Sequence, residues 1–122
     1  MAEAQKLQKA DGLRKGQPFA VFKSVSGATN KGKEIVPAVE GKTPYVVGYQ
    51  MYMSAAMDAY LASKVQKSGN PTQMNVTEHC TGACTHSPCE FDIPLEGQMS
   101  ENLGVVSDDS GAIEMTIWGY YA

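Results

Sequence analysis

The sequence lacks the features that several classes of protein require. Its 122 residues contain no apolar run near the roughly 20 residues that span a bilayer. The N-terminus also lacks the apolar segment of a secretory signal peptide. We therefore expect no membrane partner, and we expect synthesis and assembly in a cytoplasm.

Catalytic patterns are also missing. No paired carboxylates, no nucleophile beside a base and no phosphate-binding glycine loop stand out in the sequence. Asp108 and Asp109 precede Ser110 and Gly111, which is the composition of a turn. We expect that the protein is not an enzyme and that it acts by assembly or binding, or through its one cysteine cluster.

Basic residues are scarce after residue 42. From there to the end, two basic residues face nine acidic ones, a net charge of −7, whereas residues 1–42 hold eight basic residues against four acidic ones, a net charge of +4. A basic arm on an acidic body is typical of a segment that docks on an acidic partner, although a solvated tail has the same composition. Nucleic acid is disfavoured as that partner, because no aromatic residue is interleaved with the charges before Phe19 and Phe22.

The C-terminal end gives the clearest structural signal. Ile113, Met115 and Ile117 alternate with polar residues, and the turn composition of 108–111 separates this segment from an apolar run at 102–107. The pattern predicts two neighbouring strands. At this length the chain forms one domain with a single core.

Six further segments are expected to be strands: 19–22, 34–39, 45–53, 57–65, 73–77 and 91–95. Pro37 argues for an edge position or a bulge in the second of them, because proline cannot donate to a ladder. In the third, Tyr45, Val47, Tyr49, Met51 and Met53 share a face, and we expect them to lie in the core or at a subunit interface.

Segment 54–65 has two interpretations. Apolar residues at helical spacing from Met57, with Ser54 as a cap, favour a helix. The alternation from Met57 to Val65 favours a strand, which we prefer because both neighbouring segments are β. The fold class is then all-β, a small antiparallel β-sandwich or jelly-roll of about seven or eight strands at 19–122, preceded by an extended basic arm at 1–18.

All three cysteines and both histidines fall within eleven residues: His79, Cys80, Cys84, His86 and Cys89. One interpretation is a metal site, because these side chains could supply the tetrahedral set that structural zinc prefers, although the spacing does not match a pair of zinc knuckles. A second is a disulfide with one cysteine left over. A third is a reduced, exposed loop with no site, and a Cys–His catalytic pair is disfavoured because the Thr/Gly/Ser-rich loop promises no cleft or orienting group.

Several segments resemble a known family. The stretch 34–42 (EIVPAVEGK) followed by 45–49 (YVVGY), and the stretch 100–106 (SENLGVV) followed by 117–120 (IWGY), are similar to the small β-sandwich proteins of tailed-phage virions. In that group a strand of the type IVxAVxGK precedes a VxGY-like strand, and a GEALNL-like strand precedes a final VxGxxxY-like strand. The similarity covers 34–122, while the cysteine–histidine segment and the longer basic arm depart from it.

The resemblance implies a head decoration, or cement, protein: a homotrimer on the capsid surface of the virion that binds the major capsid protein. The family gives the basic arm and the cysteine–histidine segment no role. Our own hypothesis is that the arm docks on capsid subunits through its charges and apolar anchors, namely Lys6, Lys9, Arg14, Lys15, Phe19 and Phe22. In a trimer the cysteine–histidine segments could converge to bind metal or to cross-link copies. The alternative is a carbohydrate- or receptor-binding module of a viral fibre or surface protein, which would stack ligands on exposed Trp118, Tyr120 and Tyr121.

Overall fold

The computed structural model describes residues 16–122, and these residues form ten β-strands and no helix, as the all-β prediction requires. The described part of the chain holds no helix able to cross a membrane. The strands are β1 (Gln17–Val25), β2 (Lys33–Val36), β3 (Pro44–Met53), β4 (Met57–Ser63), β5 (Thr72–Gln73), β6 (Glu78–Cys80), β7 (Cys84–Thr85), β8 (Cys89–Glu96), β9 (Leu103–Ser107) and β10 (Ile113–Tyr121).

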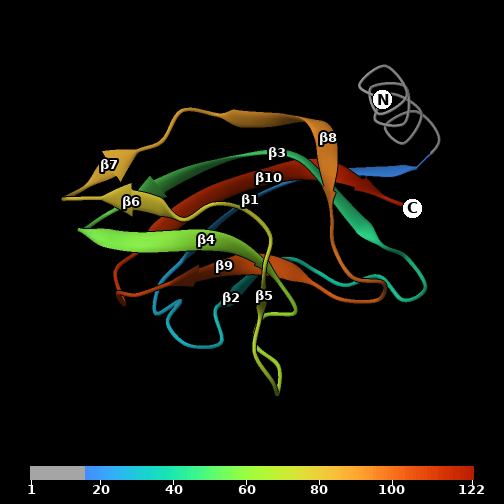
Figure 1. The fold of residues 1–122 in the computed structure, drawn as a ribbon, viewed down its shortest axis with the longest axis horizontal. Coiled ribbons are helices and arrows are strands. Elements are labelled where there is room, and N and C mark those ends of the chain that lie inside the picture. Colours follow the sequence, from blue (N-terminus) through green and yellow to red (C-terminus); the bar gives the residue numbers. More distant parts are fainter. Residues whose placement is uncertain (1–15) are drawn as a thin grey trace.

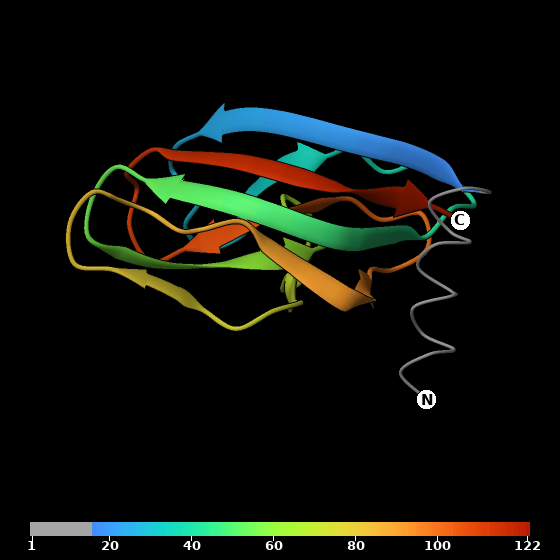
Figure 2. The same cartoon turned by 90° about the horizontal axis from the view of Figure 1, so that it is seen from above.

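The strands form two packed antiparallel sheets (Figures 1 and 2). Sheet A has the order β1-β10-β3, with β7 and β8 both pairing with the far side of β3, and sheet B has the order β2-β9-β4, with β5 and β6 both pairing with β4. Strands β1 to β4 alternate between the two sheets, β5 and β6 stay in sheet B, β7 and β8 lie in sheet A, and β9 and β10 return to the middle of sheets B and A. This is the double Greek-key connectivity of a jelly-roll.

Two edges of the sandwich are interrupted strands. Strands β6 and β5 pair with opposite ends of β4, and β7 and β8 pair with opposite ends of β3. If each interrupted edge is counted as one strand, the sandwich has eight strand positions, which agrees with the seven or eight predicted.

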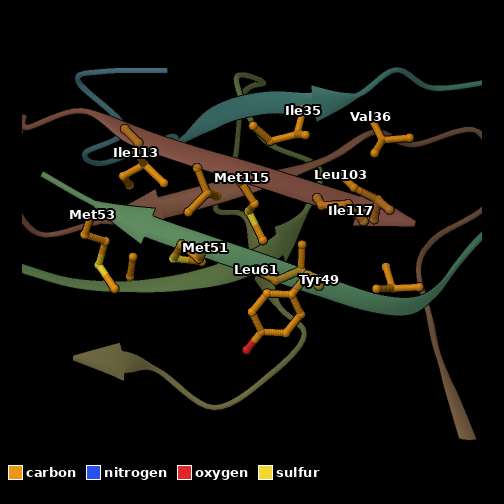
Figure 3. Packing of buried hydrophobic residues seen from close by; sticks show 14 of the residues in the cluster. Ile35, Val36, Tyr49, Met51, Met53, Leu61, Leu103, Ile113, Met115 and Ile117 are labelled. Carbon is orange, nitrogen blue, oxygen red and sulfur yellow. The ribbon is translucent and has the colours of Figure 1, made fainter. Parts of the chain in front are cut away.

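The core lies between the two sheets, and period-two alternation builds it (Figure 3). Sheet A contributes alternate residues of β3 and β10, and sheet B contributes residues of β4, β9 and β2. The largest side chains with almost no exposure include Tyr49, Met51, Met53, Leu61, Leu103, Ile113, Met115 and Ile117. The predicted alternation of the last strand is therefore confirmed, as is the core position of Tyr49, Met51 and Met53.

A β-bulge changes the faces of β3 near its start. The register shifts between Val46 and Gly48 on one side of β3 and between Trp118 and Gly119 of β10 on the other. Val46 consequently belongs to the buried cluster, while Tyr45 lies outside that cluster and stacks on Tyr120 with ring centroids 5.0 Å apart. The prediction that Tyr45 shares the core face of β3 is wrong, because the bulge reverses the alternation.

Segment 54–65 is a strand over Met57–Ser63, so the strand interpretation is confirmed and the helix is wrong. Strand β2 is an edge strand that ends before Pro37, as the proline indicated. The prediction of a strand over 73–77 is mostly wrong, since β5 ends at Gln73. Past that point the Oδ1 of Asn75 accepts the hydrogen bond of the Leu61 backbone N–H at 2.8 Å, so a side chain replaces the ladder partner.

Gly119 permits the closest backbone approach in sheet A. A Cβ atom at this residue would lie 1.9 Å from the backbone oxygen of Tyr45, whereas a Cβ at Gly82 would meet nothing within 4 Å. We predict that Gly119→Ala lowers the free energy of unfolding by about 2–4 kcal/mol, because the strand must move away from its partner. Gly82→Ala is the matched control and should change it by less than about 0.5 kcal/mol. Urea unfolding followed by circular dichroism measures both, and equal values would contradict the close approach.

Candidate functional site

The cysteine–histidine cluster lies at one end of the sandwich, where the two sheets come together around β6 and β7 (Figure 1). The segment is not the open loop that its composition suggested. His79 and Cys80 lie on β6, which pairs with β4, and Cys84 lies on β7, which pairs with β3. The backbone N–H of His86 donates to the carbonyl of Met51 at 2.9 Å. Both sheets therefore hold the backbone of the cluster in place.

Cys80 and Cys84 form a disulfide, with their Cα atoms 5.9 Å apart. Cys80 is buried and Cys84 is half-buried. Cys89 is a free, half-buried thiol on β8, where it pairs with Tyr49 in the β3–β8 register. The structure therefore agrees with the second interpretation of the cysteine–histidine segment, a disulfide with one cysteine left over.

The two histidines have different surroundings. The Nε2 of His86 lies 3.5 Å from the Sγ of Cys80 and 3.7 Å from the Sγ of Cys84. His79 instead pairs through Nδ1 with the carboxylate of Asp58; the His79 side chain is largely exposed and that of Asp58 about half exposed. Of the five predicted residues, only Cys80, Cys84 and His86 come together, with ligand atoms within 4.8 Å of one another.

A carboxylate orients His86 from behind. The Nδ1 of His86 lies 3.1 Å from the Oε2 of Glu78, whose Oε1 accepts a hydrogen bond from the Tyr49 hydroxyl at 2.5 Å. The Nδ2 of Asn75 donates to the same hydroxyl at 2.6 Å. A continuous polar chain thus runs from the sulfur atoms to Asn75 and joins segments of both sheets.

Burial is the main cause of the raised pKa of Tyr49, and the hydrogen bond and negative charge of Glu78 raise that pKa further. Tyr49 is 2% exposed, and Figure 3 shows its hydroxyl pointing away from the other labelled core residues. Glu78 and Asn75 bind this hydroxyl. The hydroxyl therefore stays protonated and acts as a donor to Glu78 throughout the neutral range.

Three residues of this chain were not singled out from the sequence: Tyr49, Asn75 and Glu78. Tyr49 was assigned to the core, and Asn75 to a strand, on the basis of alternation alone. The one available signal was the carboxylate of Glu78, which lies next to a cluster of metal-ligating residues and is the kind of group that orients such ligands.

The predicted docking residues divide between two regions. Lys6, Lys9, Arg14 and Lys15 lie outside the described residues. Phe19 is half-buried on β1 and contacts Tyr121, with ring centroids 4.9 Å apart, whereas Phe22 is 65% exposed. Since β1 begins at Gln17, the strand reaches two residues into the segment assigned to the arm.

The three aromatic residues expected to stack ligands are mostly covered. Tyr120 and Tyr121 are 2% and 5% exposed, so neither forms an exposed stacking surface, which corrects that expectation. Tyr45 stacks on Tyr120, and the hydroxyl of Tyr121 donates to the carbonyl of Pro37 at 2.7 Å. Trp118 is half-exposed and lies against Gly48, where an added Cβ would be 2.5 Å from its ring.

Comparison with models of protein families, with curated proteins and with solved structures found no match.

The raised pKa of Tyr49 makes stability depend on pH in the alkaline range. Above about pH 10 tyrosines of the unfolded chain lose their protons while Tyr49 keeps its own, so the free energy of unfolding should fall as the pH rises. Tyr49→Phe removes this contribution and should flatten the slope by up to about 1.4 kcal/mol per pH unit. At pH 7 the same variant should lose about 1–3 kcal/mol, because Asn75 and Glu78 lose their shared partner.

Urea unfolding at several pH values from 7 to 11 measures both effects. Parallel curves for the wild-type chain and Tyr49→Phe above pH 10 would contradict the prediction.

Proposed function

We propose that this protein is a capsid decoration (cement) protein, a structural virion protein that trimerises on the surface of a phage head and stabilises the shell. The resemblance of 34–122 to small virion proteins supports this function. The jelly-roll order of the strands also supports it, because viral shell domains are among the proteins built on that order. Because one fold serves many functions, the surface of the protein must also fit the proposed one.

The observation that carries the proposal is the way in which the arm joins the body. Strand β1 is an edge strand of sheet A, and it continues directly from the basic segment of the sequence. Phe22 projects from this strand with 65% of its surface exposed, and Lys23, the next residue, is exposed on the opposite face of the strand. A large exposed aromatic residue on a strand that continues from a basic segment fits an acidic protein surface with an apolar pocket.

Strand β8 offers a surface for self-association. It forms an outer edge of sheet A, and a groove of about 650 Å³ follows the strand and includes Ile93, which is 51% exposed. Pro94 cannot donate to a further strand, so open-ended extension of the sheet is blocked. We infer that copies meet here through side chains and close into a trimer.

Attachment at many sites explains how modest contacts stabilise a shell. Each trimer would carry three basic arms, and binding of the first arm raises the effective concentration of the other two. Adjacent capsid subunits would be joined by the arms, and the energy of each contact would add to the resistance of the shell to pressure from within.

Deletion of residues 2–15 tests the role of the arm and leaves β1 intact. By light scattering we expect the full-length chain near three times 13.1 kDa, and the truncated chain at three times its own, smaller mass. The truncated chain should keep its circular dichroism spectrum but lose co-sedimentation with undecorated phage heads. Replacement of Lys6, Lys9, Arg14 and Lys15 by glutamine should weaken binding in the same way. Full decoration by the truncated chain would contradict the docking role of the arm, and a monomeric wild-type chain would contradict assembly as a preformed trimer.

A second candidate function has one specific observation in its favour. The outer face of sheet A carries a hollow of about 260 Å³ that combines aromatic and polar side chains, the combination that sugar-binding sites use. It is lined by Phe22, Gln50, Tyr52, Thr85, Glu114 and Thr116. A carbohydrate- or receptor-binding module would place its ligand there.

The fluorescence of Trp118 separates the two candidates. Trp118 lies two residues along β10 from Thr116, which lines this hollow and is paired with Phe22 of β1 and Gln50 of β3. We expect no change in its emission on addition of a panel of oligosaccharides, since the indole already packs on Gly48. A saturable shift that Tyr52→Ala abolishes would support the binding module and count against decoration.

A further inference from the structure

We propose that Cys80, Cys84 and His86 form a redox-gated zinc site, which binds Zn²⁺ when the two cysteines are reduced and is closed when they form the disulfide. The inference rests on the geometry of the cluster and does not depend on the proposed function.

The distances fit tetrahedral coordination. With Zn–S near 2.3 Å and Zn–N near 2.0–2.1 Å, a tetrahedral site separates a sulfur from a nitrogen by about 3.6 Å. The Nε2 of His86 lies 3.5 Å from the sulfur of Cys80 and 3.7 Å from that of Cys84. Two of the three ligand separations are therefore already those of a zinc site, and only the two sulfurs must separate, to about 3.8 Å.

Glu78 prepares His86 for this role. Metal-ligating histidines usually donate their second ring N–H to a carboxylate, which fixes the tautomer and the ring orientation. The Nδ1 of His86 lies 3.1 Å from Glu78, so the proton belongs on Nδ1 and the lone pair of Nε2 points toward the sulfurs. Tyr49 in turn holds the other oxygen of Glu78, which keeps the carboxylate in place.

The backbone holds the ligands together without the disulfide. Cys80 belongs to β6, whose residues pair with β4, and Cys84 belongs to β7, whose residues pair with β3. His86 is fixed by its hydrogen bond to Met51. Reduction therefore breaks one covalent link while the three ligands stay on elements of the sandwich.

A dithiol or phosphine reductant supplies the electrons that open the disulfide. Two electrons and two protons convert the disulfide into two thiols, and Zn²⁺ then displaces both thiol protons to form two Zn–S bonds and one Zn–N bond. A water molecule or an external ligand takes the fourth position. Oxidation by a disulfide or by oxygen removes both sulfur ligands at once, so the same pair of atoms either binds the metal or forms the bond.

The test uses the full chain, reduced by a phosphine and kept free of oxygen. Titration with Co²⁺ should give one equivalent of bound metal with thiolate charge-transfer and tetrahedral d–d absorption, and Zn²⁺ should displace it. The oxidised chain should give neither absorption. His86→Ala should weaken binding at least tenfold and Cys80→Ser should abolish the charge-transfer bands of the paired thiolates, while Glu78→Gln should weaken binding by about 10–100-fold.

The chain supplies its own matched controls. His79→Gln and Cys89→Ser remove the other histidine and the other cysteine, and both should bind like the wild-type chain. Binding that depends on these two residues, equal binding by the oxidised chain, or no tetrahedral absorption in the reduced chain would each overturn the proposal. Circular dichroism of every reduced variant shows whether it is folded, and unfolding of the reduced wild-type chain that Zn²⁺ does not reverse would overturn it as well.

Discussion

The antiparallel pairing of β3 with β10 is the constraint on which the rest of the structure depends. These two long strands form the middle of sheet A and carry most of the large buried side chains of that sheet. β1 can exist only as a neighbour of β10, and β7 and β8 only as neighbours of β3. The cluster inherits its position from the same pairing, because the end of β3 anchors both β7 and the backbone of His86.

The polar chain from His86 to Asn75 links the two sheets at an edge of the sandwich. Edge strands expose unpaired backbone groups, and β5, β6 and β7 pair with their neighbours through only two or three residues each. Glu78 collects donors from Tyr49 and His86 and so joins β6 to sheet A. His86 beside the sulfurs and Tyr49 in the core therefore contact the same carboxylate.

Long strands with alternating apolar residues could be predicted from the sequence. Features that depend on one contact between distant residues could not. The strands from Tyr45 and Ile113 were predictable because the core imposes a period of two on long segments. The strand from Met57 followed only from its β neighbours, since its sequence also fits a helix. The bulge opposite Gly119 and the side-chain bond of Asn75 to Leu61 leave no such pattern, since each depends on one contact between distant residues. The crowding of cysteine and histidine in the sequence was enough to predict the cluster. It was not enough to tell which histidine faces the sulfurs, because that depends on the pairing of β6 and on the position of Glu78. The four basic docking residues of the arm lie outside the described residues, so the docking role of the arm stays a prediction.

The register of sheet A places the start of β1 and the cysteine–histidine cluster at opposite ends of the domain. Gln17 is paired with Tyr121, which is paired with Pro44, while Met53 at the other end of β3 is paired with Cys84. Ten residues at about 3.4 Å each put the root of the arm and the sulfur cluster roughly 30 Å apart, on opposite poles of the sandwich. A copy seated on a surface by its arm would turn the pole with the Cys80–Cys84 disulfide toward the surrounding medium, and a coat of such copies would repeat that disulfide on its outer side. The oxidation state of these cysteines would then depend on that of the medium, whereas attachment through the arm would not depend on it.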